Sequence, residues 1–386
     1  MQFLSSATPK TNDAICGRQI AFTAAFILPA LKLLEAPALL ARYAAGDLLL
    51  PALLHFLLQT AVLAVVLFAL SRSKYTLLER LQRAFGKGAA VFYIAFAAFF
   101  LFVAILPLLD LEKFTYAVFF DTAPTTFSFA FFFFFAAFFC SKGLTAIGRC
   151  ADICLFLFLF PFLALTGMSL AETDFSNLLP LFGTKFGDTM SAFTYTTPHF
   201  SDVILLLPLL ANYRPKQGDT KKILIGYGAG GICTLFFLAV FFGVYSSIAP
   251  REHYAFAKIA QYFPALDVLG RIDLVFVYLL SIVLFFHACL PLQYATDFIS
   301  RTFLERHKKY VAAAVCFCAF LFVLFFNRRY NAIYALISGK LYPVFWFIAD
   351  MVPLFLLFLP KYTPKTNGKN TSKKAVKKEA QRGIAQ

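Results

Sequence analysis

The stretch TYTTPHFSD, residues 194–202, places hydroxyls, a proline, a histidine and a carboxylate directly before an apolar run. Proline interrupts a helix because it lacks a backbone N–H and its ring crowds the preceding turn. Within a membrane, the freed backbone groups need other partners. Freed amides and the start of the next helix favour a carboxylate, and freed carbonyls accept from an ammonium. The pattern therefore predicts a site for a small zwitterion, most simply an amino acid. Its residues are Thr194, Tyr195, Thr196, Thr197, Pro198 and His199.

A second interrupted segment, ILPALKLLEAP, carries Pro29 and Pro37 around Lys32 and Glu35. Lys32 and Glu35 are three residues apart, so they share a helix face and can pair. A charge inside a membrane is costly and marks either a functional site or a structural ion pair. We expect Lys32 to pair with Glu35 or with other nearby acids. The breaks themselves are predicted around residues 29–32 and 196–199.

Other polar residues stand alone in apolar runs. His199 and Asp202 are three apart and could relay a proton, although a structural histidine fits the sequence equally well. His55, His287 and Asp350 are each expected to be packing residues that form hydrogen bonds, and His287 is the best candidate for a larger role. The candidate coupling or structural charges are Lys32, Glu35, Asp202 and His287.

The composition indicates a polytopic helical membrane protein. Of 386 residues, 60% are hydrophobic and only 14% are charged. The apolar runs are long enough to cross a bilayer core of about 30 Å as helices. We predict ten spans, organised as five plus five. They are 15–40, 48–70, 88–109, 122–139, 151–169, 190–211, 223–248, 272–300, 310–326 and 342–359.

The interrupted segments are the first span of each half, which is typical of transporters with inverted repeats and a site at the breaks. We therefore predict an all-α transmembrane domain over residues 15–360, with repeats at about 15–169 and 190–359. Residues 1–14 are predicted to be a cytoplasmic segment without a cleavable signal, and residues 361–386 a basic, disordered cytoplasmic tail.

Basic residues gather in residues 72–87, 214–222, 301–309 and 361–382, which fall on one side if there are ten spans. The positive-inside rule then puts both termini in the cytoplasm. The cluster Arg328, Arg329 and Lys340 would lie outside, against this rule, unless residues 331–340 form a surface helix. The net charge of +15 comes from loops and the tail, which favours anionic lipid over nucleic acid. The tail serves either lipid binding or topology alone.

The sequence contains no motif for an enzyme, a metal or a cofactor. The run GYGAGG, residues 226–231, opens a span instead of following a strand, so it is interpreted as helix packing by small residues. Most of the 8 cysteines lie in apolar runs without zinc-site spacing.

Several segments together resemble the spore germination permease family, the B subunits of germinant receptors, within the amino acid–polyamine–organocation superfamily. The resemblance covers residues 15–360. It rests on ICGRQIAF and APALLARYAAGD in the first span, SKGLTAIGRCADI before the fifth, SNLLPLF and TTPHFSDVILLLPLLAN around the sixth, and ALDVLGRIDLVFV at the eighth.

The resemblance implies a leucine-transporter-like fold with broken first and sixth helices. It implies a small germinant, commonly an amino acid, bound at Leu28, Pro29, Ala30 and Leu31 and at residues 194–199. It also implies two partners, a larger membrane A subunit and a lipoprotein C subunit, in the inner spore membrane.

Some positions match the family and others depart from it. Asp202 stands where the family usually has glutamate. The usual glycine-containing break is Pro29-Ala30 here, and Lys32 is unexpected. The residues matching the family's basic–acidic pairs near span entrances are Arg149 with Asp152 and Arg271 with Asp273.

Three functions compete at this stage: a germinant-sensing receptor subunit, an ion- or proton-coupled amino acid permease of the cell membrane, and an assembly subunit with a vestigial pocket. The fold alone does not choose between them.

Overall fold

The structure is a computed structural model that describes residues 15–72, 75–119, 125–180, 182–213, 216, 218–261, 273–303, 307–326, 329, 332–333 and 342–357. The N-terminal segment, the basic tail, Arg271, Arg328 and most of the predicted surface helix at 331–340 lie outside the described residues.

The regular elements of these ranges are helices, and each of the ten predicted spans contains one or more of them. The first span comprises α1 (Gly17–Phe22), a π-helical turn (Thr23–Ile27), α2 (Leu28–Lys32) and α3 (Ala36–Ala44). The sixth comprises α9 (Phe186–Phe200) and α10 (Asp202–Ala211). The other spans contain α4 (Leu49–Ser71), α6 (Ala89–Phe119), α7 (Thr125–Ser141), α8 (Leu144–Ser169), α11 (Asp219–Tyr245), α14 (Asp273–Phe303), α15 (Lys308–Phe326) and α17 (Tyr342–Leu357). Two short helices, α5 (Leu77–Phe85) and α12 (Ala255–Gln261), lie in connections.

Six helices of the described ranges are long and apolar enough to cross a membrane, and the bent first span makes seven. The multi-pass membrane class predicted from composition is therefore confirmed. The number of ten spans stays a prediction, because α7, α17 and the two halves of the sixth span are each shorter than the others.

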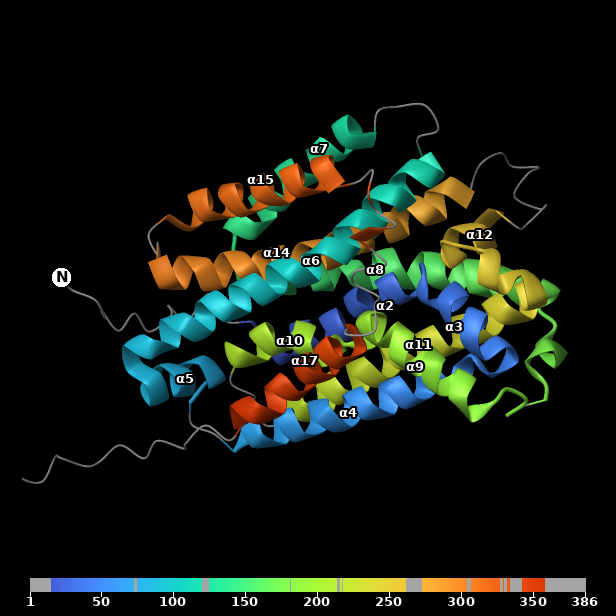
Figure 1. Cartoon of the computed structure of the whole chain (residues 1–386), viewed down its shortest axis with the longest axis horizontal. Coiled ribbons are helices and arrows are strands. Elements are labelled where there is room, and N and C mark those ends of the chain that lie inside the picture. Colours follow the sequence, from blue (N-terminus) through green and yellow to red (C-terminus); the bar gives the residue numbers. More distant parts are fainter. Residues whose placement is uncertain are drawn as a thin grey trace, which may run out of the picture.

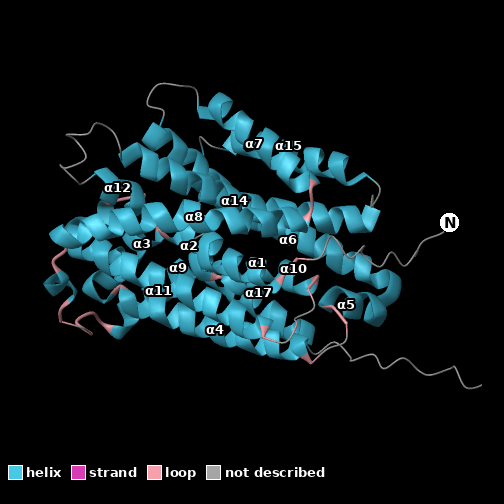
Figure 2. Cartoon of the chain, turned by 180° about the vertical axis from the view of Figure 1, so that it is seen from behind, coloured by secondary structure: helices cyan, strands magenta, loops and turns pink. Residues whose placement is uncertain are grey.

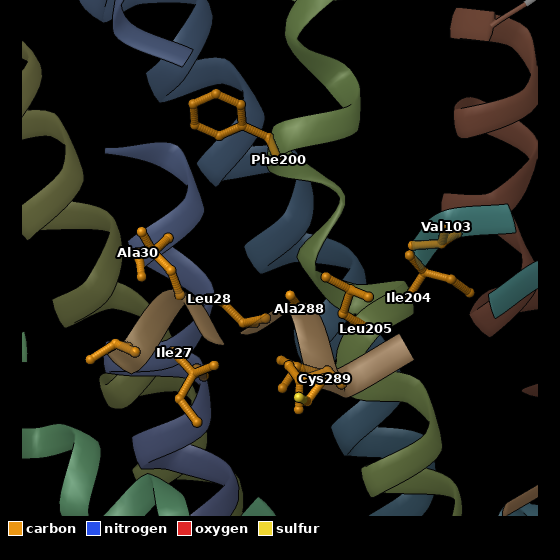
Figure 3. Packing of buried hydrophobic residues seen from close by; sticks show 14 of the residues in the cluster. Ile27, Leu28, Ala30, Val103, Phe200, Ile204, Leu205, Ala288 and Cys289 are labelled. Carbon is orange, nitrogen blue, oxygen red and sulfur yellow. The ribbon is translucent and has the colours of Figure 1, made fainter. Parts of the chain in front are cut away.

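The helices form two groups that meet at the broken spans. In Figure 1, α7 and α15 lie side by side and cover α14 and α6, whereas α4, α9, α10 and α17 lie together on the other side. Seen from behind in Figure 2, the first span runs between these groups and packs on α8, α11 and α14. Figure 3 shows Ala288 and Cys289 of α14 between Leu28 of the first span and Leu205 of α10.

The first span breaks at residues 33–35, slightly later than the predicted 29–32. The helix axes before and after this point differ by 61°. Pro29 only widens the preceding turn into a π-helix, in which the Leu28 amide donates to the Thr23 carbonyl. Pro37 lies in the first turn of α3, and its missing N–H and its ring prevent the bond to the Leu33 carbonyl that would continue the helix through the bend.

The sixth span also breaks later than predicted. Residues 194–199 belong to α9, and Pro198 lies inside that helix. The chain leaves the helical conformation at Ser201, with ψ of 65°, and α10 begins at Asp202. The expectation of a break at 196–199 is therefore wrong by a few residues. The hydroxyls of Thr196 and Thr197 bond to the carbonyls of Ala192 and Phe193 within their own helix, so they are not freed by a break.

The glycine run of α11 brings the first span close, as predicted. A Cβ at Gly226 would stand 2.5 Å from the Ala21 carbonyl oxygen, and one at Gly230 would stand 2.9 Å from that of Ala24. Glycine therefore allows backbone-to-backbone packing of α11 against the span that contains Lys32.

We predict that the two ends of α11 face opposite sides of the membrane. The helix has 27 residues, or about 40 Å, and the amide of Asp174, just after α8, bonds to Gly243 near its far end. In a variant without native cysteines, Glu172→Cys is expected to react with an impermeant reagent from outside and Lys221→Cys only after permeabilisation. Labelling of both from one side contradicts the topology.

Candidate ligand site at the two broken spans

A buried ion pair joins the two breaks. Lys32 ends α2 and Asp202 begins α10, and the Lys32 Nζ lies 2.6 Å from the Asp202 Oδ1. The two side chains are only 1% and 3% exposed. A cation at a helix C-terminus and an anion at a helix N-terminus each interact favourably with the helix dipole. The breaks thus bring together the ends of two half-helices with complementary charges.

Both members of the pair have further partners. Lys32 Nζ also donates to the Leu28 carbonyl at 3.2 Å, and it lies 6.0 Å and 5.6 Å from the ring centres of Phe56 and Phe200. The second oxygen of Asp202 accepts from the Tyr227 hydroxyl at 2.9 Å. A buried pair is tolerated only when such additional bonds offset the cost of removing both charges from water.

The predicted direct pair between Lys32 and Glu35 is wrong, and the alternative of another nearby acid is correct. Glu35 is the last residue of the bend, where its carboxylate contacts the Nδ1 of His253 at 2.9 Å. Residues 253–256, which we call the strap, also bond to the break itself. The amides of Ala255 and Phe256 donate to the carbonyls of Leu34 and Leu33, at 3.0 Å and 3.1 Å. The strap thus satisfies backbone acceptors at the break.

A second polar cluster surrounds the break of the sixth span. The Gln59 side chain of α4 donates to the Asp350 carboxylate of α17 at 2.8 Å and accepts from the Val203 amide in the first turn of α10 at 3.1 Å. The Ser201 hydroxyl donates to the same oxygen of Asp350 at 3.2 Å. Asp350 was expected to be a hydrogen-bonded packing residue, and Gln59 and Tyr227 were not singled out. In the sequence, the only indication of a role for Gln59 or Tyr227 was a polar side chain within an apolar run.

A small cavity adjoins the ion pair. Its volume is about 20 Å³ for the centre of a water-sized sphere, so it holds a water molecule and not an amino acid. Binding of a larger molecule therefore requires its walls to move apart. The polar part of the wall consists of His199, Ser201, Asp202 and His287. The remaining lining residues are Leu31, Val103, Leu106, Pro107, Pro198, Leu205, Pro291 and Trp346.

The structure brings some predicted site residues to this cavity and leaves others away from it. Leu31, Pro198, His199, Asp202 and His287 line it. Leu28, Pro29 and Ala30 are buried in the core of the first span.

Residues 194–197 do not line the cavity. The Thr194 hydroxyl bonds to the Ser191 carbonyl. Tyr195 stacks on Tyr43 with 4.9 Å between ring centres and is 36% exposed. The Thr196 hydroxyl also lies 3.2 Å from His55 Nε2, which places His55 against α9 as a packing residue.

At the entrance of α8, Asp152 pairs with a different residue from the one that the family pattern predicts. Asp152 contacts Arg18 of α1 at 3.2 Å and accepts from the Gln19 side chain at 3.3 Å. The partner predicted from the family pattern, Arg149, is not among these contacts. Asp273 is described only as the first residue of α14.

Solved structures with the same arrangement of helices are transporters. Two structures of a manganese transporter from Eremococcus coleocola, a mutant and a complex with an aromatic bis-isothiourea-substituted compound, each align with a TM-score of 0.51 and 11% identity. They cover 88% and 92% of this chain, and 77% and 81% of theirs. At this identity the likeness shows the fold alone: a leucine-transporter-like helical membrane fold.

The sequence identifies the family within this class. A family model described as spore germination protein matches residues 33–332, and the chain belongs to that family. The resemblance inferred from the motifs is therefore confirmed. A comparison with curated proteins found no match.

We predict that removing one member of the buried pair is far more harmful than removing both. Lys32→Met leaves the Asp202 charge buried without its cation, and the expected loss in free energy of unfolding is about 3–5 kcal/mol. The double variant Lys32→Met/Asp202→Asn removes both charges, keeps an acceptor for Tyr227 and is expected to recover most of this loss. Unfolding in detergent micelles measures each value.

The matched control is Lys222→Met, since Lys222 pairs with Asp219 but its side chain is 64% exposed. Its effect is expected to stay below about 1 kcal/mol. A double variant as unstable as Lys32→Met would show that the two charges do not depend on each other.

The strap is predicted to be held more strongly at low pH. The hydrogen bond to Glu35 raises the pKa of His253, with burial acting in the opposite direction. A raised pKa in the folded state means that the stabilisation is full below the ordinary histidine pKa and is lost as the pH rises through the raised value. Because His253 is 56% exposed, we expect less than about 1 kcal/mol after solvent screening.

The measurement is the stability difference between the parent and His253→Gln across pH, which is expected to shrink at alkaline pH. Glu35→Gln is expected to abolish this pH dependence, whereas His307→Gln, at an exposed position, retains it. A difference that grows with pH is the contrary outcome.

Proposed function

We propose that this chain is the permease-like membrane subunit of a spore germinant receptor, and that it binds a small zwitterionic germinant, an amino acid, between the two breaks. Family membership supports the role in germination. The observation that carries the ligand class is the buried pair of Lys32 and Asp202, which offers one positive and one negative group side by side.

A zwitterion can replace this pair without changing the buried charge. Its carboxylate takes the place of Asp202 beside Lys32, and its ammonium takes the place of Lys32 beside Asp202. An anion or a cation alone leaves one buried charge without a partner, which costs several kcal/mol. The apolar walls from Leu31, Leu205 and Trp346 favour a small apolar side chain on the ligand.

Binding in this way separates the two breaks. α2 and α10 are joined directly by the ion pair, so a molecule inserted between Lys32 and Asp202 moves one half-helix relative to the other. This movement is the signal that we assign to the receptor. A larger membrane A subunit and a lipoprotein C subunit are the proposed partners, in the inner spore membrane and with both termini of this chain in the cytoplasm.

The second candidate is an ion- or proton-coupled amino acid permease, favoured by the fold shared with solved transporters. Uptake of labelled amino acids by proteoliposomes separates the two functions. Binding without uptake supports sensing, and uptake supports transport. If the folded protein neither binds amino acids nor takes them up, the remaining function is that of an assembly subunit.

The expected result of a binding screen is selective stabilisation by one or a few amino acids. Purified protein is heated with a panel of amino acids, and saturation at about 100 times the dissociation constant adds about 2.7 kcal/mol. Leu31→Phe, which narrows the cavity, is expected to abolish the effect. Leu57→Phe on α4, which is 58% exposed, is the matched control and keeps it.

Thr197→Val and Tyr195→Phe test the other half of the proposed site. Loss of binding in either variant places ligand contacts along residues 194–197. If both bind like the parent while Leu31→Phe does not, the ligand contacts lie only around the cavity. Binding that is unchanged in all three variants contradicts a site at the breaks.

A further inference from the structure

We propose that Asp350 of α17 is a proton-binding site, and that the bound proton controls how firmly α17 and α4 hold the break of the sixth span. The proposal holds for a sensor and for a transporter, because it concerns a carboxyl group that the ion pair of Lys32 and Asp202 does not use.

The surroundings of Asp350 make it an acid without a cation. Its residue is only 3% exposed. One oxygen accepts from the Gln59 amide and from the Ser201 hydroxyl, and both donors are neutral. The Ser201 hydroxyl shares its proton with the Thr197 carbonyl oxygen, which lies 2.9 Å away. The other oxygen, Oδ1, is buried and has no hydrogen-bond partner among the residues that the structure describes. The structure therefore presents a free carboxyl oxygen in a water-poor site.

Neighbouring charges do not neutralise this carboxylate. The buried titratable groups on the described helices that pack against α17 are His55 of α4, Arg80 of α5, His199 of α9 and Asp202 of α10, and His287 of α14 lines the cavity together with Trp346. The same helices also carry Glu79, Arg83, Asp188 and Tyr195, which are more exposed. Asp350 forms an ion pair with none of them within the described residues. The nearby Lys32 is already paired with Asp202, and Tyr227 donates to Asp202 as well.

The charge sum of the site follows from these contacts. Lys32 and Asp202 cancel, so an ionised Asp350 leaves one net negative charge in the core. Burying an uncompensated charge costs several kcal/mol. A proton taken from water onto the free lone pair of Oδ1 brings the sum to zero. No other bond has to form or break in this step.

The proton changes the bonds that hold the break. Charged acceptors form stronger hydrogen bonds than neutral ones. Protonation of Asp350 therefore weakens the bonds from Gln59 and Ser201. Gln59 also accepts from the Val203 amide, so the same side chain joins α17 and α4 to the first turn of α10. Loss of the proton tightens these bonds, and its uptake loosens them.

Asp350 is connected to the proposed ligand site through residues that line the cavity. Ser201 donates to Asp350 and also lines the cavity with Asp202. Trp346 lines it too and precedes Asp350 by about one helical turn. The sequence contains 1 tryptophan, so Trp346 is a natural reporter of this carboxyl group.

The test is a pH titration of Trp346 fluorescence with the full chain in lipid nanodiscs and without any amino acid. We expect a single one-proton transition in the parent. Asp350→Asn, which mimics the protonated acid, is expected to lose the transition and to keep one intensity at every pH. His199→Gln and His287→Gln, at the two histidines that line the cavity, are expected to keep it.

A second variant tests the hydrogen bonds independently of Asp350→Asn. Ser201→Ala removes one donor to the carboxylate, which favours its neutral form, so the midpoint is expected to move toward alkaline pH. Size-exclusion chromatography and circular dichroism establish that the variants are folded. If Asp350→Asn does not fold, the shift in Ser201→Ala decides the question.

The proposal is overturned by a transition that persists in folded Asp350→Asn, by a transition lost in a histidine variant, or by an unchanged midpoint in Ser201→Ala. Replacing sodium by choline at constant pH is expected to change nothing. A sodium-dependent fluorescence change would assign a metal cation to this carboxylate in place of the proton. Since no germinant is present, failure here leaves the proposed receptor function standing.

Discussion

The salt bridge between Lys32 and Asp202 is the interaction on which the centre of the molecule depends. It links residues 170 positions apart in the chain, one at the end of α2 and one at the start of α10. Each half-helix has backbone groups at its broken end that lack a partner within the helix, and each ion has the sign that its helix end favours. The pair therefore stabilises two breaks at once, in a region where neither could be hydrated by bulk water.

The surrounding packing serves to keep this pair dry and aligned. Glycines 226 and 230 let α11 approach the first span, and Tyr227 between them reaches Asp202. Phe56 and Phe200 cover the ammonium of Lys32. The aromatic richness of the chain thus has a specific use here, because ring faces attract a cation while they exclude water.

Much of the fold could be predicted from the sequence, since apolar length and helical backbone bonding leave few alternatives inside a membrane. The breaks were located to within a few residues, and in the first span the predicted range began at Pro29, which the helix accommodates by a π-helical turn. Glu35 was the only partner that could be named for Lys32, with other nearby acids as the alternative, because helix periodicity reports only neighbours three or four residues away. Its true partner, and the contact of Glu35 with His253, depend on tertiary packing. Gln59 was missed for the same reason.

The hydroxyl-rich stretch that first suggested a site illustrates the limit of residue type as evidence. The hydroxyls of Thr196 and Thr197 bond to carbonyls of their own helix, so their polarity is satisfied locally and does not by itself indicate a ligand. The residues that reach the cavity, Pro198, His199 and Asp202, come from the end of the same stretch. The sequence could define the segment. Which of its side chains face the cavity depends on the orientation of the helix about its axis, which the sequence did not show.

The strap at residues 253–256 has a consequence for which substitutions the protein can accept. Its bonds to Leu33 and Leu34 run from main chain to main chain. Side-chain identity at Ala255 and Phe256 can therefore vary, within the space available, without removing the hydrogen bonds, and only a proline deletes a donor. The connection that follows α11 is thus held to the first span by backbone amide groups, which every residue except proline has. A shift of this connection therefore moves the bend beside Lys32 through these main-chain hydrogen bonds. The movement does not depend on which side chains the strap carries.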